Sequence, residues 1–445
     1  MNSIYEVNCP KEIKKNALVE VVVPGSKSIT NRALLLAAMS NGTSTLKGCL
    51  TSDDARHFIE CLKALGFPVT ELPDGNLGSD ITITGFGGTI PNKAAEIYVG
   101  SAGTAARFLV AMLAFSDGEY TINSSEQMKK RPMQPLIEAL RDAGATVKCL
   151  EEEGHFPLYI IGAKKQASIP SHFTVNIDKS SQFLSALLIA IGTLGKTADI
   201  HVIGSHGLSY VDLTVAMMKD FGVQVIKQVI DGQIQYHFEG ESSYQALDYP
   251  IEPDMSAAAY FYALAAVLGS KVTVKGVTSH MLQGDTAFLE VLEKMGCELI
   301  GLNENIIIAG PDNAPLVGGF SIDMSSFSDQ ALTLAAIAPF ANAPITITGI
   351  GHIRLQECDR IGAIVHNLTA LGIKVDEKEN EVTIYPGTPK GSDIETYDDH
   401  RVAMSFALTG LKTEGVRILN PECCKKTFAQ YFEVFDKVLN ELTQD

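Results

Sequence analysis

The chain repeats one pattern six times, and this repetition limits the possible fold more than any single motif does. Each period has a small or polar start, a long apolar helix, a short turn and a strand rich in β-branched residues. The periods begin at Ser28, Gly103, Ser180, Met255, Ser328 and Asp399. Their spacing of about 75 residues is longer than that of the usual solenoid repeats. The sequence therefore predicts an α/β fold assembled from six copies of one unit.

The second half of each period follows a common plan as well. A shorter, amphipathic helix comes next, and in five periods a glycine after it is typical of a C′ cap: Gly66, Gly144, Gly222, Gly296 and Gly372. These five periods then close with a strand that ends at glycine or alanine. The sixth period stops after its helix, over 427–442, and so lacks its last strand.

The N-terminal segment VEVVVPG, over 19–25, has the alternation and final glycine of the missing strand. We therefore expect it to complete the sixth repeat. Three repeats then form a continuous domain over 26–252, and three more form a discontinuous domain over 1–25 plus 253–445. The chain crosses twice between the domains, near Gly25 and Pro253, and we expect the active site in the cleft between them.

Composition excludes several classes of function. The 445 residues carry a formal charge of -17 and no Lys/Arg-rich run, which argues against nucleic acid and against an anionic membrane as partners. No apolar run reaches about 18 residues, so we expect no membrane span. The eight cysteines show no CxxC spacing, which favours a reduced compartment. We expect a cytoplasmic monomer that acts on small molecules.

Several helix starts combine cations with small polar residues. PGSKSITNRA places Lys27 and Arg32 beside the hydroxyls of Ser28 and Thr30, and GSAGTAARF places Gly103 before an arginine. A helix N-terminus carries a positive dipole end, so cations gathered there indicate an anionic ligand. The alternative for each start, taken alone, is an ordinary N-cap. Six such starts together favour an anion site.

Further polar groups belong to the same series. KKRP contributes Arg131, DKSSQFL contributes Ser180, Ser181 and Gln182, RLQECDRI places Glu357 three residues before Arg360, DDHRVAM contributes Arg401, and CCKKTF contributes Lys426. Asp329, in FSDQALT, is either an N-cap or a general base. No second His or Cys has ligand spacing to His400, so we expect no metal there.

These segments in their order resemble the EPSP synthases, the 3-phosphoshikimate 1-carboxyvinyltransferases. The resemblance runs from Val19 to Phe432 and includes SDDARH and KKRPMQPLIEALRDAGA as well. It implies a two-domain, inside-out α/β barrel of six βαβαββ-type repeats, three to a domain. It also implies transfer of the enolpyruvyl group of phosphoenolpyruvate to the 5-hydroxyl of shikimate 3-phosphate, with neither metal nor organic cofactor.

The resemblance implies a role for each matched residue. Phosphoenolpyruvate would be bound by Lys27, Gly103, Arg131, Gln182, Arg360, Arg401 and Lys426. Shikimate 3-phosphate would be bound by Lys27, Ser28, Arg32, Ser180, Ser181, Gln182, Tyr210, Asp329 and Gln356. Asp329 would take the proton of the 5-hydroxyl, while Glu357 and Lys27 are the candidates to protonate the methylene carbon of phosphoenolpyruvate.

Four positions depart from the family pattern: Gln356 replaces a lysine, Gly207 a serine, His352 an asparagine, and Phe108 a proline or leucine. Two other functions stay open. A related UDP-N-acetylglucosamine enolpyruvyltransferase would need a reactive cysteine in a mobile loop, and Cys49, Cys61 and Cys149 lack such a setting. A repeat protein that only binds an anion would not need Asp329 and Glu357 beside cations.

Overall fold

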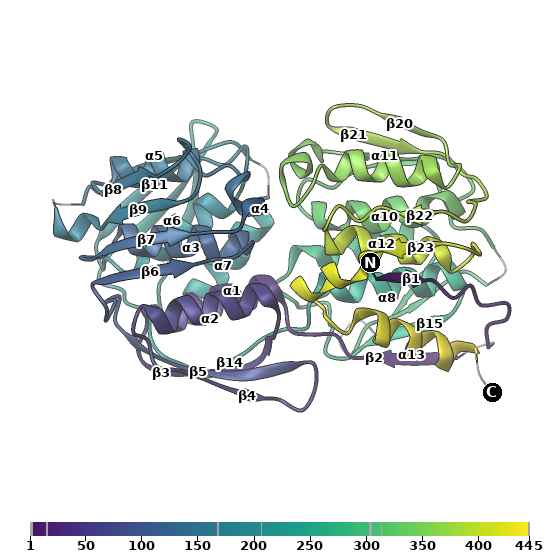
Figure 1. Ribbon diagram of the computed structural model, residues 1–445, viewed down its shortest axis with the longest axis horizontal. Helices are drawn as coiled ribbons and strands as arrows, with labels where there is room; N and C mark the ends of the chain where they lie inside the picture. Colours follow the sequence, from purple (N-terminus) through teal and green to yellow (C-terminus); the bar gives the residue numbers. More distant parts are fainter. Residues whose placement is uncertain are drawn as a thin grey trace. The chain divides into compact units, whose positions relative to one another are not determined.

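The computed structural model describes residues 3–14, 17–166, 169–205, 207–301, 305–312 and 314–443. The chain divides into two compact units (Figure 1). Unit 1 combines Met1–Pro24 with Glu252–Asp445, and unit 2 is the continuous stretch Gly25–Ile251. In the part of the chain that is described, each unit holds three small sheets.

Unit 2 contains three sheets of four strands. Their orders are β14-β3-β5-β4 (Tyr249–Pro250, Asn41–Leu50, Gly78–Phe86, Val69–Pro73), β6-β7-β9-β8 (Ala94–Tyr98, Glu119–Asn123, Leu158–Ile161, Thr146–Cys149) and β10-β11-β13-β12 (His172–Asn176, Thr197–Ile203, Gln233–Glu239, Ile226–Ile230). The first helices of its repeats are α1 (Lys27–Met39), α3 (Gly103–Ala114) and α6 (Gln182–Gly192). The second helices are α2 (Asp53–Ala64), α5 (Gln134–Asp142) and α7 (Leu208–Asp220), and a short α4 (Glu126–Lys129) precedes α5.

Unit 1 contains two four-stranded sheets and one of three strands. Their orders are β16-β17-β15-β2 (Glu298–Ile300, Ile307–Ala309, Lys271–Val274, Leu18–Val21), β18-β19-β21-β20 (Phe320–Asp323, Ile345–Thr348, Glu381–Ile384, Val375–Glu377) and β1-β23-β22 (Ile4–Glu6, Arg417–Leu419, Asp393–Ile394). The first helices are α8 (Met255–Leu268), α10 (Ala331–Ile337) and α12 (His400–Gly410). The second helices are α9 (Ala287–Lys294), α11 (Arg360–Ala370) and α13 (Tyr431–Thr443).

The same pairing recurs in every four-stranded sheet. An outer strand is parallel to the strand that follows the first helix, and the other two pairs are antiparallel. The first helices are apolar nearly all round and form the interior: α12 is buried along its whole length and packs against α8 and α10, while α3 packs against α1 and α6. Helices inside and sheets outside confirm the predicted inside-out α/β architecture (Figure 1).

The prediction for the VEVVVPG strand is wrong. Strand β2 pairs in parallel with β15 and so opens the sheet of the fourth repeat, and β1 pairs with β23 of the sixth. The reason is that two strands, β2 and β14, exchange places where the chain passes from one unit to the other. Strand β14, which immediately precedes α8, belongs to the α1 sheet in unit 2, so the α8 repeat takes its first strand from β2, which precedes α1. When a strand pairs with a distant part of the chain, the sequence around it does not show which strand is its partner.

The glycine caps are confirmed. Gly66, Gly144, Gly222, Gly296 and Gly372 all have φ between 78° and 95°, the left-handed region that ends a helix at little cost only for glycine. Within the described residues, none of the helices combines the length and the apolar character that crossing a bilayer requires.

Candidate active site

The start of α1 in unit 2 presents Lys27. Ser26 caps this helix by accepting a bond from the Ile29 N–H at 3.4 Å, which leaves Lys27 and Ser28 in the first turn. Lys27 Nζ lies 3.8 Å from Asp54 at the start of α2, an acidic partner that the sequence did not reveal. Thr30, by contrast, is wholly buried and accepts a bond from the Leu50 N–H, so its hydroxyl serves the core.

Arg32, one turn further along α1, is a buried cation. Its guanidinium donates to Thr214 Oγ1 at 2.7 Å, to the Ser28 carbonyl at 3.0 Å and to the Tyr210 carbonyl at 2.9 Å. All three acceptors are neutral, and burial lowers the pKa of Arg32 to about 10. A buried charge that only neutral groups surround is costly, and an anion that joins it recovers that cost.

A second buried cation sits at the start of α3. Arg107 donates to Gln182 Oε1 at 2.8 Å and lies over the Phe183 ring, 5.3 Å from its centroid. Gln182 in turn donates to Thr104 Oγ1 at 3.0 Å. Burial, together with the charge of Arg131, lowers the pKa of Arg107 well below its usual range. Arg107 thus fixes the amide of Gln182, a predicted ligand-binding group, although no role for Arg107 itself was predicted from the sequence.

Gly103 and Arg131 lie against each other. A Cβ built on Gly103 would come within 2.4 Å of Arg131 Nη1 and 2.6 Å of Arg131 Cζ. The absence of a side chain at 103 therefore gives the guanidinium its place at the start of α3. Among the described residues, no carboxylate lies within ion-pair distance of Arg32, Arg107 or Arg131. This part of unit 2 has an excess of positive charge, as an anion site requires.

The remaining predicted groups of unit 2 gather at the starts of α6 and α7. Ser180 Oγ accepts a bond from the Gln182 N–H at 3.3 Å, and Ser181 stands at the N-cap position of α6. Tyr210 lies in the first turn of α7, where its carbonyl accepts from Arg32. One chain of contacts therefore links α1, α3, α6 and α7.

Unit 1 brings its own predicted residues together around Asp329. Arg401 Nη2 lies 2.8 Å from Asp329 Oδ2, and Arg360 Nη1 lies 3.0 Å from Asp329 Oδ1. Arg360 also donates to Asp399, which is fully buried and caps α12. Burial alone would lower the pKa of Arg360, but Asp399 and Asp329 raise it; burial would raise the pKa of Asp399, and Arg360 lowers it. The guanidinium and this carboxylate are both ionised.

Glu357 forms a second acidic centre beside these arginines. Lys426 Nζ lies 3.2 Å from Glu357 Oε2, and His400 Nδ1 lies 3.9 Å from the same oxygen. Glu357, Asp399 and His400 have ligand atoms within 4.8 Å of one another, a spacing that a metal ion could use. Lys426 and Arg360 already engage the two carboxylates, so the cluster carries its own countercharges. The group contains no second His or Cys; the other two possible ligands of His400 are carboxylates, which the sequence argument on His and Cys spacing did not consider.

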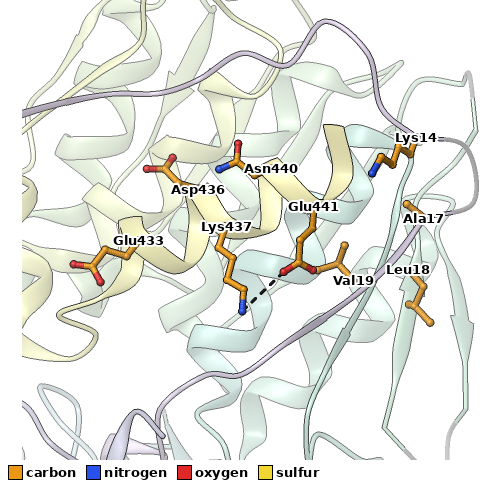
Figure 2. Close-up of a pocket in the computed structure, with 9 residues that line it drawn as sticks. All are labelled: Lys14, Ala17, Leu18, Val19, Glu433, Asp436, Lys437, Asn440 and Glu441. Atoms are coloured by element: carbon orange, nitrogen blue, oxygen red, sulfur yellow. Dashed lines mark ion pairs between the residues drawn. The ribbon is translucent and has the colours of Figure 1, made fainter. Parts of the chain in front are cut away.

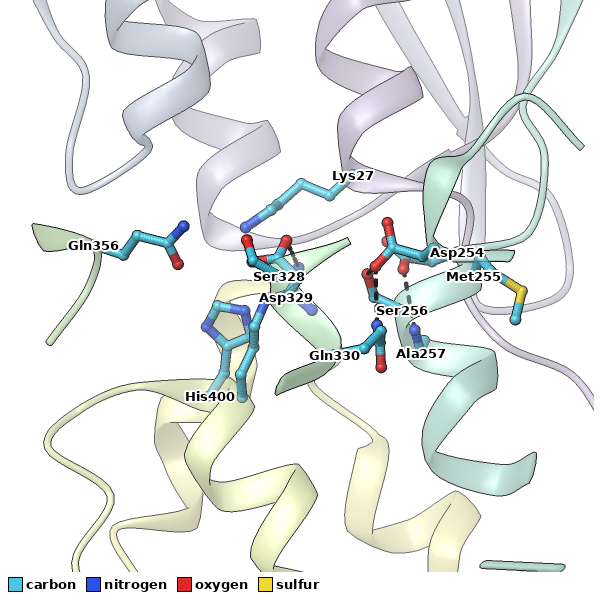
Figure 3. Close-up of polar contacts among 12 residues, drawn as sticks. Lys27, Asp254, Met255, Ser256, Ala257, Ser328, Asp329, Gln330, Gln356 and His400 are labelled. Atoms are coloured by element: carbon cyan, nitrogen blue, oxygen red, sulfur yellow. Dashed lines mark hydrogen bonds and ion pairs between the residues drawn. The ribbon is translucent and has the colours of Figure 1, made fainter. Parts of the chain in front are cut away.

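A buried polar network supports the turn that carries Asp329. Asp285 Oδ1 accepts from Ser256 Oγ and from Gln330 Nε2, both at 2.9 Å, and Gln330 Oε1 accepts from Thr333 at 3.0 Å. Figure 3 shows Ser256 at the start of α8 and Gln330 next to Asp329. Burial, and then the charge of Asp329, raises the pKa of Asp285. The sequence did not single out Asp285, because its partners lie 29 and 45 residues away.

The four departures from the family pattern have distinct places. Gln356 Oε1 accepts from Arg360 Nη1, and His352 Nε2 lies 2.8 Å from Ser328 Oγ. Gly207 stands at the N-cap position of α7 with φ 65°, where a serine would be strained. Phe108 is fully buried and lies beneath the Arg32 guanidinium, 5.4 Å from it. The ring therefore supports a predicted ligand-binding cation.

Comparison with known proteins decides the family. The sequence model described as EPSP synthase (3-phosphoshikimate 1-carboxyvinyltransferase) matches residues 12–435. The chain belongs to the EPSP synthase family. A 3-phosphoshikimate 1-carboxyvinyltransferase of Nostoc sp. is 43% identical over 94% of this chain and 96% of its own length. A second, from Halalkalibacterium halodurans, is 43% identical over 94% of this chain and 91% of its own.

Solved structures agree with this EPSP synthase fold. An EPSP synthase of Acinetobacter baumannii superposes with a TM-score of 0.79 at 24% identity, covering 98% of both chains. An enolpyruvyl transferase of Streptomyces tendae gives 0.73 at 17% identity, covering 98% of this chain and 96% of its own. As an EPSP synthase, the chain has 3-phosphoshikimate 1-carboxyvinyltransferase activity, in the shikimate pathway of aromatic amino acid biosynthesis.

Two cysteines of unit 2, Cys49 and Cys61, do not suit the rival enolpyruvyl transferase chemistry. Cys49 and Cys61 are buried, and burial raises the pKa of both thiols, that of Cys61 to about 12. Cys149 Sγ accepts a bond from the Gly154 N–H at 3.3 Å. An activated thiol needs a lowered pKa and access to solvent, so Cys49 and Cys61 are inert.

Proposed function

We propose that the predicted residues at the helix starts of unit 2, together with those around Asp329 and Glu357 in unit 1, bind the two substrates of the EPSP synthase reaction. Phosphoenolpyruvate is bound by Lys27, Gly103, Arg131, Gln182, Arg360, Arg401 and Lys426. Shikimate 3-phosphate is bound by Lys27, Ser28, Arg32, Ser180, Ser181, Gln182, Tyr210, Asp329 and Gln356. The uncompensated cations of unit 2 support this proposal, because two polyanionic substrates supply the missing negative charge.

The observation that carries the catalytic assignment is the position of Asp329 between two guanidinium groups. Two cations beside a carboxylate favour its ionised form. When the anionic groups of phosphoenolpyruvate engage Arg360 and Arg401, those guanidinium groups turn to the substrate. Asp329 then becomes more basic at the moment when both substrates are bound, which suits a general base.

The reaction then proceeds without a covalent link to the enzyme. Asp329 takes the proton of the 5-hydroxyl as its oxygen attacks C2 of phosphoenolpyruvate, and Glu357 or Lys27 gives a proton to C3. A tetrahedral intermediate results. Phosphate leaves as a proton is removed from the same methyl carbon, which restores the double bond. Lys426, 3.2 Å from Glu357, holds this carboxylate in place, and the surrounding cations stabilise the charge that develops.

Asp285 and Asp399 act as positioning residues in this proposal. Asp399 holds the Arg360 guanidinium through two bonds, at 2.8 and 3.3 Å. Asp285 holds the Gln330 side chain and thereby the turn over Ser328–Gln330 that presents Asp329. Neither carboxylate needs to touch a substrate.

Conservative substitutions test the proton-transfer roles. Asp329→Asn and Glu357→Gln keep the side-chain shape and remove the charge, so turnover should fall by about 10² or more for each while the fold is kept. The N-cap alternative for Asp329 is wrong, because Gln330 precedes α10 and Phe327 precedes the turn over Ser328–Gln330; Asp359, not Glu357, caps α11. If the two carboxylates take no part in proton transfer, the variants should lose little turnover. Near-normal kcat in both variants would remove them from the mechanism. Asp359→Asn is a matched control, since Asp359 caps α11 and has no assigned role in the reaction.

We further propose that the enzyme is a cytoplasmic monomer. All the groups assigned to the substrates come from one chain, so the assignment needs no second copy. Sedimentation equilibrium at assay concentrations should give the mass of one chain, 47.8 kDa. If the measured mass were that of a stable dimer, the proposal of a monomer would be contradicted, and the catalytic assignment would not be affected.

A further inference from the structure

A cavity of about 610 Å³ lies in unit 1 at the C-terminal end of α8. Its walls include Leu268 to Lys271, which run from the last residue of α8 to the first of β15, and Lys412, just beyond α12. Asp254 and Asp399, which cap these two helices, stand at the opposite ends. The cavity is therefore separate from the residues assigned to the reaction.

Basic side chains outnumber acidic ones in the lining of this cavity, whereas acidic side chains outnumber basic ones in the chain as a whole. The chain has 52 acidic and 35 basic side chains, yet Lys14, Lys271 and Lys412 line the cavity against one carboxylate, that of Asp312. Among the described residues, none of the three ammonium groups has a carboxylate within ion-pair distance. Burial lowers the pKa of Lys412, although its side chain reaches solvent, and no carboxylate opposes that effect.

A buried hydroxyl in the same wall also lacks a partner. Ser270 is 4% exposed, and its Oγ has no hydrogen-bond partner within the described part of the chain. Its backbone is fully engaged, since its N–H donates to the Ala265 carbonyl and its carbonyl accepts from the Gly310 N–H. Buried hydroxyls are nearly always hydrogen-bonded. A donor without a partner beside three cations fits a site for an acceptor.

Neither helix dipoles nor a generally basic surface explains the lysines of this cavity. Lysines after α8 and α12 complement the negative ends of the helix dipoles, but that leaves the hollow and the Ser270 hydroxyl unexplained. The neighbouring cavity between α13 and β2 has the same volume, and its charges are mixed (Figure 2). Its lining contains Glu433, Asp436 and Glu441 as well as Lys14 and Lys437, and Lys437 lies 3.9 Å from Glu441. Uncompensated positive charge is thus not a general property of this face.

We propose that the cavity beside Ser270 binds a small organic anion through Lys271, Lys412, Lys14 and the Ser270 hydroxyl. The rest of the lining defines the other end of the ligand. Leu268, Pro311, Pro315 and Phe340 present apolar surface, which suits a ring or a short hydrocarbon portion. The class of ligand is a phosphate or carboxylate attached to a compact apolar group, and its site is independent of the residues assigned to the reaction.

Phenyl phosphate is a suitable probe, with inorganic phosphate as the test of the apolar end. Calorimetric titrations are made with saturating shikimate 3-phosphate present, so that phosphate-binding groups of the active site are occupied. Phenyl phosphate should bind with a Kd of about 1 mM or lower, inorganic phosphate more weakly, and both should weaken as salt is added. Lys271→Met and Lys412→Met should each weaken phenyl phosphate by about 5-fold or more. Lys437→Met, which removes a paired lysine of the neighbouring cavity, should not.

Ser270→Ala provides an independent measurement. The hydroxyl has no partner to lose, so this variant should keep the Tm of the unliganded protein. It should also bind phenyl phosphate more weakly, with unchanged kcat and KM for the reaction. The proposal is overturned if phenyl phosphate shows no saturable binding up to about 10 mM, or if its affinity is the same in Lys271→Met, Lys412→Met and Lys437→Met. A lower Tm in Ser270→Ala would show that the hydroxyl already has a partner.

Discussion

Replacing Arg32 with methionine should separate substrate binding from stability. Burial lowers the pKa of Arg32 to about 10, and each unit below the ordinary value of an arginine corresponds to about 1.36 kcal/mol, so the charge costs roughly 3 kcal/mol in the unliganded protein. The guanidinium donates to three neutral acceptors, and such bonds return about 1 kcal/mol each. Since these contributions nearly cancel, we expect Arg32→Met to change the free energy of unfolding by about 1 kcal/mol or less.

Arg360→Met is the matched comparison, because Arg360 is also a buried arginine but has carboxylate partners. Its removal leaves Asp399, 0% exposed, without its cation, and breaking a buried pair in this way costs about 3 to 5 kcal/mol. Urea unfolding followed by circular dichroism measures both variants. Shikimate 3-phosphate should stabilise the wild type and Arg360→Met but not Arg32→Met. If Arg32→Met loses as much stability as Arg360→Met, or is still stabilised by the ligand, the excess positive charge of unit 2 does not serve this substrate.

Two further variants test the neighbourhood of the reacting groups. Glyphosate, which is longer than phosphoenolpyruvate, should compete with it. Gly103→Ala should raise the inhibition constant of glyphosate about 5 to 150-fold and weaken phosphoenolpyruvate less, because the added methyl, which meets Arg131, takes space that the longer ligand needs and costs it about 1 to 3 kcal/mol. Noncompetitive inhibition, or an equal loss for phosphoenolpyruvate, would show that Gly103 is wrongly assigned. Asp285→Ala should lower kcat by about 10-fold or more with a smaller change in KM. Asp285→Asn keeps an acceptor for the Gln330 amide, so it should retain most of the wild-type kcat. Equal losses in the two variants would mean that Asp285 does not act by holding the Gln330 side chain.

The repeat and the helix boundaries could be predicted because they are local. Five C′ glycines and the polar starts of the six inner helices are legible in windows of about 20 residues. The positions of Arg360 and Arg401 follow from the same starts. The partner of each group could not be predicted in this way.

The missed features all depend on contacts between distant segments. Thr214, which orients Arg32, lies 182 residues further along the chain, and Asp285 reaches Gln330 over 45 residues. The strand over 19–25 was assigned to the wrong repeat for the same reason, because its apolar alternation fits any of the sheets and β15 lies some 250 residues away. Local pattern determines which face a strand buries, and tertiary packing selects its neighbour.

The assignment of both substrates to this chain is tested most directly by phosphate release. A coupled assay should detect phosphate when phosphoenolpyruvate and shikimate 3-phosphate are present together, and none when either is left out or when UDP-N-acetylglucosamine replaces shikimate 3-phosphate. Release that depends on both substrates and is lost in Asp329→Asn is the result we expect. Release with UDP-N-acetylglucosamine, or none with shikimate 3-phosphate, would contradict the assignment.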